Sequence, residues 1–173
     1  MSSNQRPVFL VVMGVAGCGK SSLGQAVATA LALPLIEGDD HHSADSRTKM
    51  SQGIALTDAD REGWLTTLGD LLQSHPQGAV LTCSALKKVY RDRLRNACPA
   101  LRFAFLRIEK SQAEMRVKAR AQTHFFSAAL VDSQFATLEL PVGEPGVLAL
   151  DAALPLAALQ EQTCAWISAK EIA

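Results

Sequence analysis

The segment that most constrains the fold is an apolar run that leads directly into a glycine-rich turn. Residues 8–13 read Val-Phe-Leu-Val-Val-Met, and residues 14–21 read Gly-Val-Ala-Gly-Cys-Gly-Lys-Ser. The second stretch fits the phosphate-loop pattern G-x-x-x-x-G-K-[ST], which requires a strand before it and a helix after it. Strand–loop–helix units of this kind belong to α/β proteins with a parallel sheet, so the sequence predicts that class.

The same residues allow a second interpretation. Val15-Ala16-Gly17-Cys18 follows an apolar run and Arg6, as in a lipoprotein signal that is cleaved before a lipid-modified cysteine. A signal segment is dispensable to the domain that follows it. Here the apolar run is the first element of a regular alternation, and its removal would take away the expected central strand. We therefore favour the phosphate loop.

Apolar runs alternate with helical patterns along the chain. The expected strands are short and rich in Val, Leu, Ile and Phe, as strands buried on both faces are; they span residues 8–14, 33–37, 79–84, 101–108 and 147–150. The expected helices span residues 20–32, 58–73, 86–96, 111–120 and 154–169. This alternation predicts a single α/β domain over residues 1–173, in three layers, with a five-stranded parallel sheet flanked by helices. Residues 141–146 are expected to form a surface loop.

Composition argues against several classes of partner. The 17 Lys and Arg residues balance 17 Asp and Glu residues, so no global charge attracts nucleic acid or an anionic membrane. No apolar run approaches the roughly 18 residues of a membrane span. The four cysteines include no C-x-x-C pair, so we expect free thiols in a reducing cytoplasm and no structural zinc site; they are Cys18, Cys83, Cys98 and Cys164.

The phosphate loop predicts a site for a nucleoside triphosphate. Glycines at 14, 17 and 19 permit positive φ and leave backbone N–H groups open to phosphate oxygens at a helix N-terminus. Lys20 is expected to reach the β- and γ-phosphates of ATP, and Ser21 to ligate Mg²⁺. We expect no redox role for Cys18. The predicted ATP-binding residues are Gly14, Val15, Ala16, Gly17, Cys18, Gly19, Lys20, Ser21, Ser22, Arg116 and Arg120.

A GTPase is one alternative use of such a loop. Residues 60–63 match the GTPase pattern D-x-x-G by letters, but they open an expected helix. No N-K-x-D, the pattern that reads guanine, occurs in the chain. The sequence therefore disfavours a GTPase.

The acceptor of the phosphoryl group is expected beyond the second strand, because ligands of open parallel sheets bind at the carboxyl ends of strands. Asp39 follows that strand and is our candidate to align an acceptor hydroxyl for in-line attack. His41 and His42 follow closely, and one of them can contact the same hydroxyl group; His42 is our candidate. Lys87, Arg91 and Arg95 recur every four residues, and such like charges repel unless an anion meets them. Lys87 is best placed to meet an acidic substrate.

A second basic pair lies on a later helix. Arg116 and Arg120 share one helix face, from which they can stack on adenine and stabilise charge on the transferring phosphoryl group. The polar and aromatic residues 121–126 that follow are typical of a flap that closes over ATP and excludes water. We place a mobile lid at about residues 116–140.

Taken together, the motifs resemble those of the gluconokinases. The resemblance covers roughly residues 8–141 and rests on K-M-x-x-G…L-x-D-x-D-R-x-x-W-L (residues 49–65) and C-S-A-L-K-K-x-Y-R-D (residues 83–92), besides the phosphate loop. Four shorter stretches complete it: Gly38-Asp39, Lys118-Ala119-Arg120, His124-Phe125-Phe126 and Gln134-Phe135-Ala136-Thr137-Leu138.

This resemblance implies a P-loop kinase fold and transfer of the ATP γ-phosphoryl group to the 6-hydroxyl of D-gluconate, giving 6-phospho-D-gluconate and ADP. It also implies a Mg²⁺-dependent, cytoplasmic homodimer. The implied catalytic residues are Lys20, Asp39 and Arg120. The implied substrate-binding residues are Asp39, His42, Lys49, Arg61, Lys87 and His124.

The chain departs from the family pattern at several positions. Ser43 and Ser46 stand where Pro and Asn are usual, and Ala55 and Gly63 replace prolines. Three residues separate Arg120 from His124 where many members have two, so the expected flap is one residue longer here. Two alternatives stay open: another P-loop small-molecule kinase, of the shikimate or nucleoside-monophosphate type, and a non-catalytic ATP-binding module.

Overall fold

The strand that precedes the phosphate loop is the middle strand of the sheet. In the computed structural model, which describes residues 6–120 and 128–169, β1 (Val8–Met13) pairs with β3 (Gly78–Thr82) and with β4 (Leu101–Arg107). The sheet has five strands in the order β2-β3-β1-β4-β5, where β2 is Leu35–Glu37 and β5 is Val147–Asp151, and all its pairings are parallel. The predicted five-stranded parallel sheet and its central first strand are confirmed.

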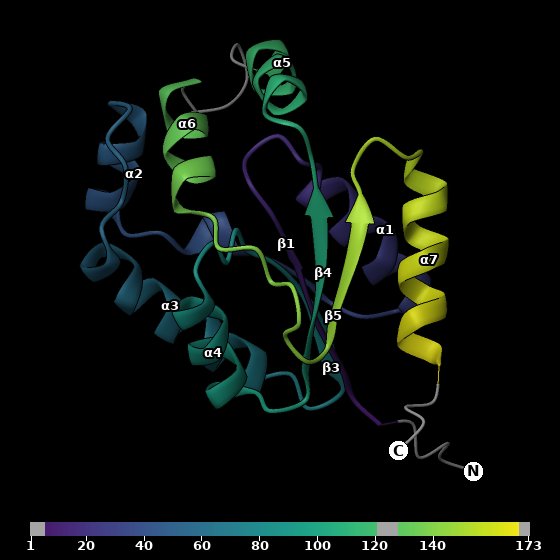
Figure 1. The fold of residues 1–173 in the computed structure, drawn as a ribbon. Coiled ribbons are helices and arrows are strands. Elements are labelled where there is room, and N and C mark those ends of the chain that lie inside the picture. The colour runs from purple at the N-terminus through teal and green to yellow at the C-terminus, as the bar shows by residue number, and fades with distance from the viewer. Residues whose placement is uncertain (1–5, 121–127, 170–173) are drawn as a thin grey trace.

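Helices cover both faces of the sheet, as a parallel sheet requires. Figure 1 shows α1 (Lys20–Leu31) and α7 (Leu156–Ser168) on one face, and α3 (Asp58–Gln73) and α4 (Lys88–Ala97) on the other. The last four residues of β1 are completely buried between these layers. In the part of the chain that the structure describes, no helix has the length and apolar character needed to cross a membrane.

Three helical segments were not predicted: the 3-10 turn η1 (Gly38–His41), α2 (Ala44–Ser51) and α6 (Ala128–Thr137). α2 is polar and carries no apolar stripe, so periodicity does not reveal it. Its start is marked by Ser43, whose side chain accepts a hydrogen bond from the Ser46 N–H as an N-cap. The two serines that depart from the family pattern thus form a capped helix start.

The basic stripe on α4 meets an anion of the chain itself. Arg91 is fully buried, and its guanidinium donates to both carboxylate oxygens of Glu144, at 2.6 Å from Nη2 and 3.0 Å from Nε. Arg95 also donates to Glu144, at 2.9 Å, and lies over the Phe103 ring. The anion that meets Arg91 and Arg95 is therefore Glu144, which the predicted surface loop 141–146 inserts between them.

Arg91 also holds three chain segments together. Its Nη1 donates to the carbonyls of Ala85 and Leu86 at 2.7 and 3.1 Å, and its Nη2 donates to the Glu139 carbonyl at 3.0 Å. Burial raises the pKa of the Glu144 carboxyl, but hydrogen bonds from Arg91 and Arg95 outweigh burial and hold the pKa below its ordinary value of 4.5. The Glu144 carboxylate is therefore charged at neutral pH and neutralises the charge of the buried Arg91 guanidinium.

We expect Glu144→Ala to lower the free energy of unfolding by about 3–5 kcal/mol at pH 7, because it leaves a buried guanidinium without its counter-charge. Since the Glu144 pKa is lowered by folding, this contribution is complete above pH 4.5 and fades as the pH falls through the folded-state pKa. Urea denaturation at several pH values measures both effects. Glu62→Ala, which breaks an exposed pair with Arg93, is the matched control and should cost under about 1 kcal/mol. Equal losses in the two variants would contradict the assignment.

Candidate active site

A cavity of about 410 Å³ lies where the phosphate loop, the segment after β2, the start of α3 and the helices α5 (Lys110–Arg120) and α6 come together. Its wall includes Lys20 from the loop, Asp39 from η1, Arg61 from α3, Arg120 from α5 and Gln134 from α6. The structure thus brings all three predicted catalytic residues to one cavity.

The phosphate loop has the backbone geometry that its glycines predict. Gly14, Gly17 and Gly19 all have positive φ. At Gly17 a side chain is also excluded by space, because a Cβ atom there would lie 2.8 Å from the Ala113 carbonyl oxygen of α5. Among the described residues, no side chain caps the start of α1, so its first-turn N–H groups are left for an anion.

Lys20 lies folded over this loop. Its Nζ donates to the carbonyls of Gly14 and Val15 at 3.0 and 3.1 Å. These carbonyls hold the ammonium group beside the cradle, from which it can turn to phosphate oxygens without a change in the backbone. The loop and its lysine together can bind the phosphate chain of a nucleotide.

A carboxylate that sequence reasoning missed stands next to Ser21. The Ser21 hydroxyl donates to Glu37 Oε2 at 3.0 Å, and the Thr82 hydroxyl donates to the same oxygen at 2.6 Å. The signal that could have identified Glu37 is its position at the end of β2, next to the carboxyl end of the neighbouring strand. A hydroxyl and a carboxylate are hard oxygen donors, and Mg²⁺ is usually held by one or two such groups together with water and substrate phosphates. The residues present therefore fit Mg²⁺ better than a metal that needs a full protein cage; no cluster of three or more His, Cys, Asp or Glu exists among the described residues.

Asp39 is positioned by contacts around η1. Gly38 allows this close packing, because a Cβ atom there would lie 2.2 Å from the Thr82 carbonyl oxygen. Trp64 Nε1 donates to the Gly38 carbonyl at 2.8 Å and fixes the turn. The Asp39 side chain itself is 82% exposed and open to the cavity.

His42 supports Asp39 from the buried side. Its ring stacks on Trp64 with centroids 4.2 Å apart, and its Nε2 lies 3.5 Å from Asp39 Oδ1. The hydrogen bond from His42, followed by the charge of Lys20, lowers the pKa of Asp39 below its ordinary value. The carboxylate is therefore ionised at neutral pH and can accept a hydrogen bond from a hydroxyl group.

Two arginines line the cavity near Asp39, of which Arg47 was missed. Arg47 donates to the Asp40 and His42 carbonyls at 2.6 and 3.3 Å, so it also shapes the turn after β2. Arg61 donates to the Leu56 carbonyl at 3.1 Å and to the Tyr90 hydroxyl at 3.3 Å. Both guanidinium groups keep further N–H donors, because each has five. They can bind an anionic group of a substrate.

Lys49 and Lys87, the two lysines predicted to bind the substrate, do not line this cavity. Lys49 pairs with Asp60 at 2.8 Å, and this hydrogen bond lowers the pKa of Asp60 to about 2. Lys87 pairs with Asp58 at 2.9 Å. Asp58 also accepts a hydrogen bond from the Tyr90 hydroxyl, so Lys87 is linked to Arg61 through Tyr90. His124 lies outside the described residues.

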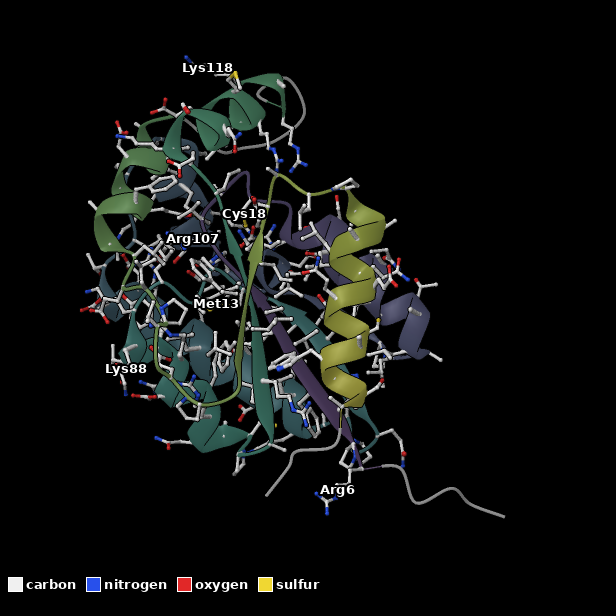
Figure 2. The ribbon with its side chains drawn as sticks, turned by 45° about the vertical axis from the view of Figure 1, so that its right-hand side comes forward. Arg6, Met13, Cys18, Lys88, Arg107 and Lys118 are labelled. Atoms are coloured by element: carbon white, nitrogen blue, oxygen red, sulfur yellow. The ribbon has the colours of Figure 1, made fainter. Side chains whose placement is uncertain are left out.

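The basic pair on α5 faces the phosphate loop. Arg116 donates to the carbonyls of Gly17 and Cys18 and, at 3.0 Å, to the Ala152 carbonyl after β5. Arg120 lines the cavity. Figure 2 shows Lys118 at the outer side of the same helix. α5 thus turns its arginines toward the nucleotide site.

The Cys18 side chain is part of the core. Only 1% of it is exposed, and Figure 2 shows it inside the molecule near the end of the sheet. Burial raises the pKa of the Cys18 thiol, against smaller opposing effects of Lys20 and Arg116. Burial likewise raises the pKa of Cys83 to about 12. Both thiols are protonated and poorly nucleophilic at neutral pH.

Comparison with known proteins relates this site to small-molecule kinases. The family model described as shikimate kinase matches residues 16–131. The chain is 44% identical over 147 residues to the gluconokinase of Gluconobacter oxydans, an alignment that covers 83% of this chain and 82% of that protein. It is 39% identical to the thermoresistant gluconokinase of Escherichia coli, with 90% of each chain covered. Among solved structures, a gluconokinase from Sinorhizobium meliloti superimposes with a TM-score of 0.86 at 43% identity, covering 95% of this chain and 94% of that one.

Proposed function

This chain belongs to the gluconokinase family, and we propose that it transfers the γ-phosphoryl group of ATP to the 6-hydroxyl of D-gluconate, releasing 6-phospho-D-gluconate and ADP. The observation that carries this function is that the phosphate loop with Lys20, the ionised Asp39 and Arg61 share one cavity. Such a cavity can hold a triphosphate, a hydroxyl group and an acid at the same time. The similarity to gluconokinases over most of both chains favours this reaction over transfer to shikimate or to a nucleoside monophosphate, and over ATP binding without turnover.

The nucleotide is held by backbone N–H groups of the loop and by the first turn of α1. Lys20 leaves the Gly14 and Val15 carbonyls and binds the β- and γ-phosphates. Arg116, which already bridges the loop and the segment after β5, is placed to contact the adenine. Arg120 stabilises the negative charge on the phosphoryl group during transfer.

Ser21 and Glu37 are the residues that would hold Mg²⁺, Ser21 directly and Glu37 beside it. When bound, the metal would neutralise charge on the phosphate groups of the nucleotide. Thr82 keeps Glu37 turned toward Ser21 by its hydrogen bond to the same carboxylate oxygen.

Asp39 orients the acceptor. Its carboxylate accepts a hydrogen bond from the 6-hydroxyl and takes the proton as the oxygen attacks phosphorus, while the ADP oxygen leaves. His42 and Trp64 hold Asp39 in place, so the acceptor meets a fixed partner.

The carboxylate of gluconate is assigned to Arg61 and Arg47. A sugar acid extends from its reacting hydroxyl to its carboxylate, so the cation that binds it must line the same cavity as Asp39. Arg61 and Arg47 do so. Lys87 supports Arg61 through Asp58 and Tyr90, and Lys49 fixes the start of α3 through Asp60.

Further parts of the proposal rest on the length and composition of the chain and on the family resemblance. The chain acts as one kinase domain over residues 1–173, with a lid at about residues 116–140 that includes His124 and that is joined to the phosphate loop through Arg116 and Gln134. It depends on Mg²⁺. It works in the cytoplasm, as a homodimer. It needs no nucleic acid or membrane partner.

The function is tested by an acceptor panel. Purified protein with ATP and Mg²⁺ should release ADP rapidly with D-gluconate and much more slowly with shikimate or nucleoside monophosphates, and the product should carry phosphate on the 6-hydroxyl by ³¹P and ¹³C NMR. Turnover with a different acceptor alone would contradict the substrate, and ATP binding without turnover would favour a binding module.

Asp39→Asn should lower kcat by about 10²–10⁴-fold, because the amide cannot take the hydroxyl proton. The KM for ATP should change little, since Asp39 lies on the acceptor side. Steady-state kinetics with each substrate varied in turn measures the change in kcat and the change in the KM for ATP separately. A large loss of ATP affinity with intact acceptor kinetics would place Asp39 in the metal site instead.

Arg61→Met should raise the KM for gluconate by about 10- to 100-fold, the loss expected for a hydrogen bond to a charged group. Lys87→Met should raise it less, because Lys87 acts through Asp58 and Tyr90. The KM for ATP serves as the internal reference in both variants. A larger effect of Lys87→Met would move the carboxylate from Arg61 to Lys87.

A further inference from the structure

One side chain of α6 reaches into the phosphate loop. Gln134 Oε1 accepts a hydrogen bond from the Ala16 N–H at 2.7 Å, which joins segments 118 residues apart in the sequence. Ala16 lies between the glycines at 14 and 17, so this N–H group belongs to the loop that faces the phosphates. Gln134 is therefore joined directly to the phosphate loop.

The hydrogen bond fixes the orientation of the carboxamide. The Ala16 N–H can donate only to the amide oxygen of Gln134, so Oε1 faces Ala16. The NH₂ group is then at the other side of the carboxamide. Gln134 lines the same cavity as Lys20, Asp39 and Arg120. Within residues 6–120 and 128–169, the bond to Ala16 is the only hydrogen bond of this side chain, so the two N–H donors of Nε2 have no protein acceptor there.

Gln134 lies close to a firmly anchored end of α6. One turn further along the chain, the Glu139 N–H donates to the Leu86 carbonyl at 2.8 Å, and the Glu139 carboxylate accepts from the Lys88 N–H at 2.7 Å. Buried Arg91 donates to the Glu139 carbonyl at 3.0 Å. This anchor holds the Gln134 backbone at a fixed distance from the loop, so its side chain is a preorganised part of the site.

We propose that Gln134 is a catalytic residue of phosphoryl transfer: with Oε1 held by the Ala16 amide, Nε2 donates a hydrogen bond to an oxygen of the γ-phosphoryl group. The inference rests on the proposed kinase function and adds a residue to it. Phosphoryl oxygens share the charge of the transition state, and a fixed donor stabilises them. Gln134 gains and loses no proton; the γ-phosphoryl group passes from ATP to the acceptor oxygen, ADP leaves, and the hydroxyl proton goes to Asp39.

Gln134→Glu isolates the donor. A carboxylate oxygen still accepts from the Ala16 N–H, but the NH₂ group is replaced by a negative charge that faces the phosphates. We expect affinity for a non-hydrolysable ATP analogue with Mg²⁺ to fall about 10- to 100-fold, and affinity for ADP to stay within about twofold, because ADP lacks the γ-phosphoryl group. With gluconate, kcat should fall by at least about 100-fold. Calorimetric titration at pH 8 and steady-state kinetics measure these changes.

Gln134→Leu is the second variant, of similar size, and removes both ends of the amide. It should also reduce affinity for the ATP analogue more than affinity for ADP, though by a smaller factor than Gln134→Glu, since it adds no charge. Asp132→Asn is the matched control on the same helix. It weakens the exposed pair with Lys110 without touching the loop and should leave the ratio of the two affinities unchanged.

An unchanged ratio of ATP-analogue to ADP affinity in a folded Gln134→Glu or Gln134→Leu protein, or an equal loss for both nucleotides, would overturn the proposal, because a purely structural role affects both alike. Circular dichroism melting identifies the variants that fold. The binding measurement needs no gluconate. The wild-type protein could fail to phosphorylate gluconate while the variants still lose more affinity for the ATP analogue than for ADP. In that case the proposed acceptor is wrong and the γ-phosphoryl contact stands.

Discussion

The structure depends on a row of backbone N–H groups that the central strand delivers to the start of a helix. β1 is buried between two layers, so its carboxyl end is fixed, and the loop that follows must turn within a few residues into α1. The turn is held from outside as well. α5 packs against Gly17, Arg116 binds the Gly17 and Cys18 carbonyls, and Gln134 binds the Ala16 amide. The anion cradle is thus held in shape by contacts of the chain itself, which is what electrostatic preorganisation requires.

The acceptor side is built on the neighbouring strands and is connected to the cradle. Glu37 at the end of β2 receives hydrogen bonds from Ser21 of the loop helix and from Thr82 of β3. The next residue, Gly38, packs on the Thr82 carbonyl and is held by Trp64, which also stacks on His42. Asp39 therefore stands at a defined distance from the loop because three strands end together. A single change at Gly38 would disturb both the Ser21–Glu37 pair and the acceptor side.

Much of the fold could be predicted from the sequence, because strong local signals and the global architecture agree. Buried strands of a parallel sheet appear in the sequence as continuous apolar runs, and the phosphate-loop pattern requires a strand before it and a helix after it. The polar helix α2 has no such signal, and only its Ser43 cap marks it. The partners of the α4 arginines could not be predicted, since Glu144 lies about fifty residues away and enters by tertiary packing alone.

The same division holds for the site. Lys20, Ser21 and Asp39 could be predicted from the motif and from the strand end, but Glu37 and Gln134 gain their importance from contacts across the sheet and between α6 and the loop.

The most direct test of the central claim is a backbone amide NMR titration of this 173-residue protein with Mg²⁺ and ATP. The N–H resonances of residues 16–22 should shift first and furthest, and Lys20→Met should suppress these shifts while the folded spectrum persists. Saturable ATP binding that leaves these amides unmoved, or no binding at all, would contradict the claim.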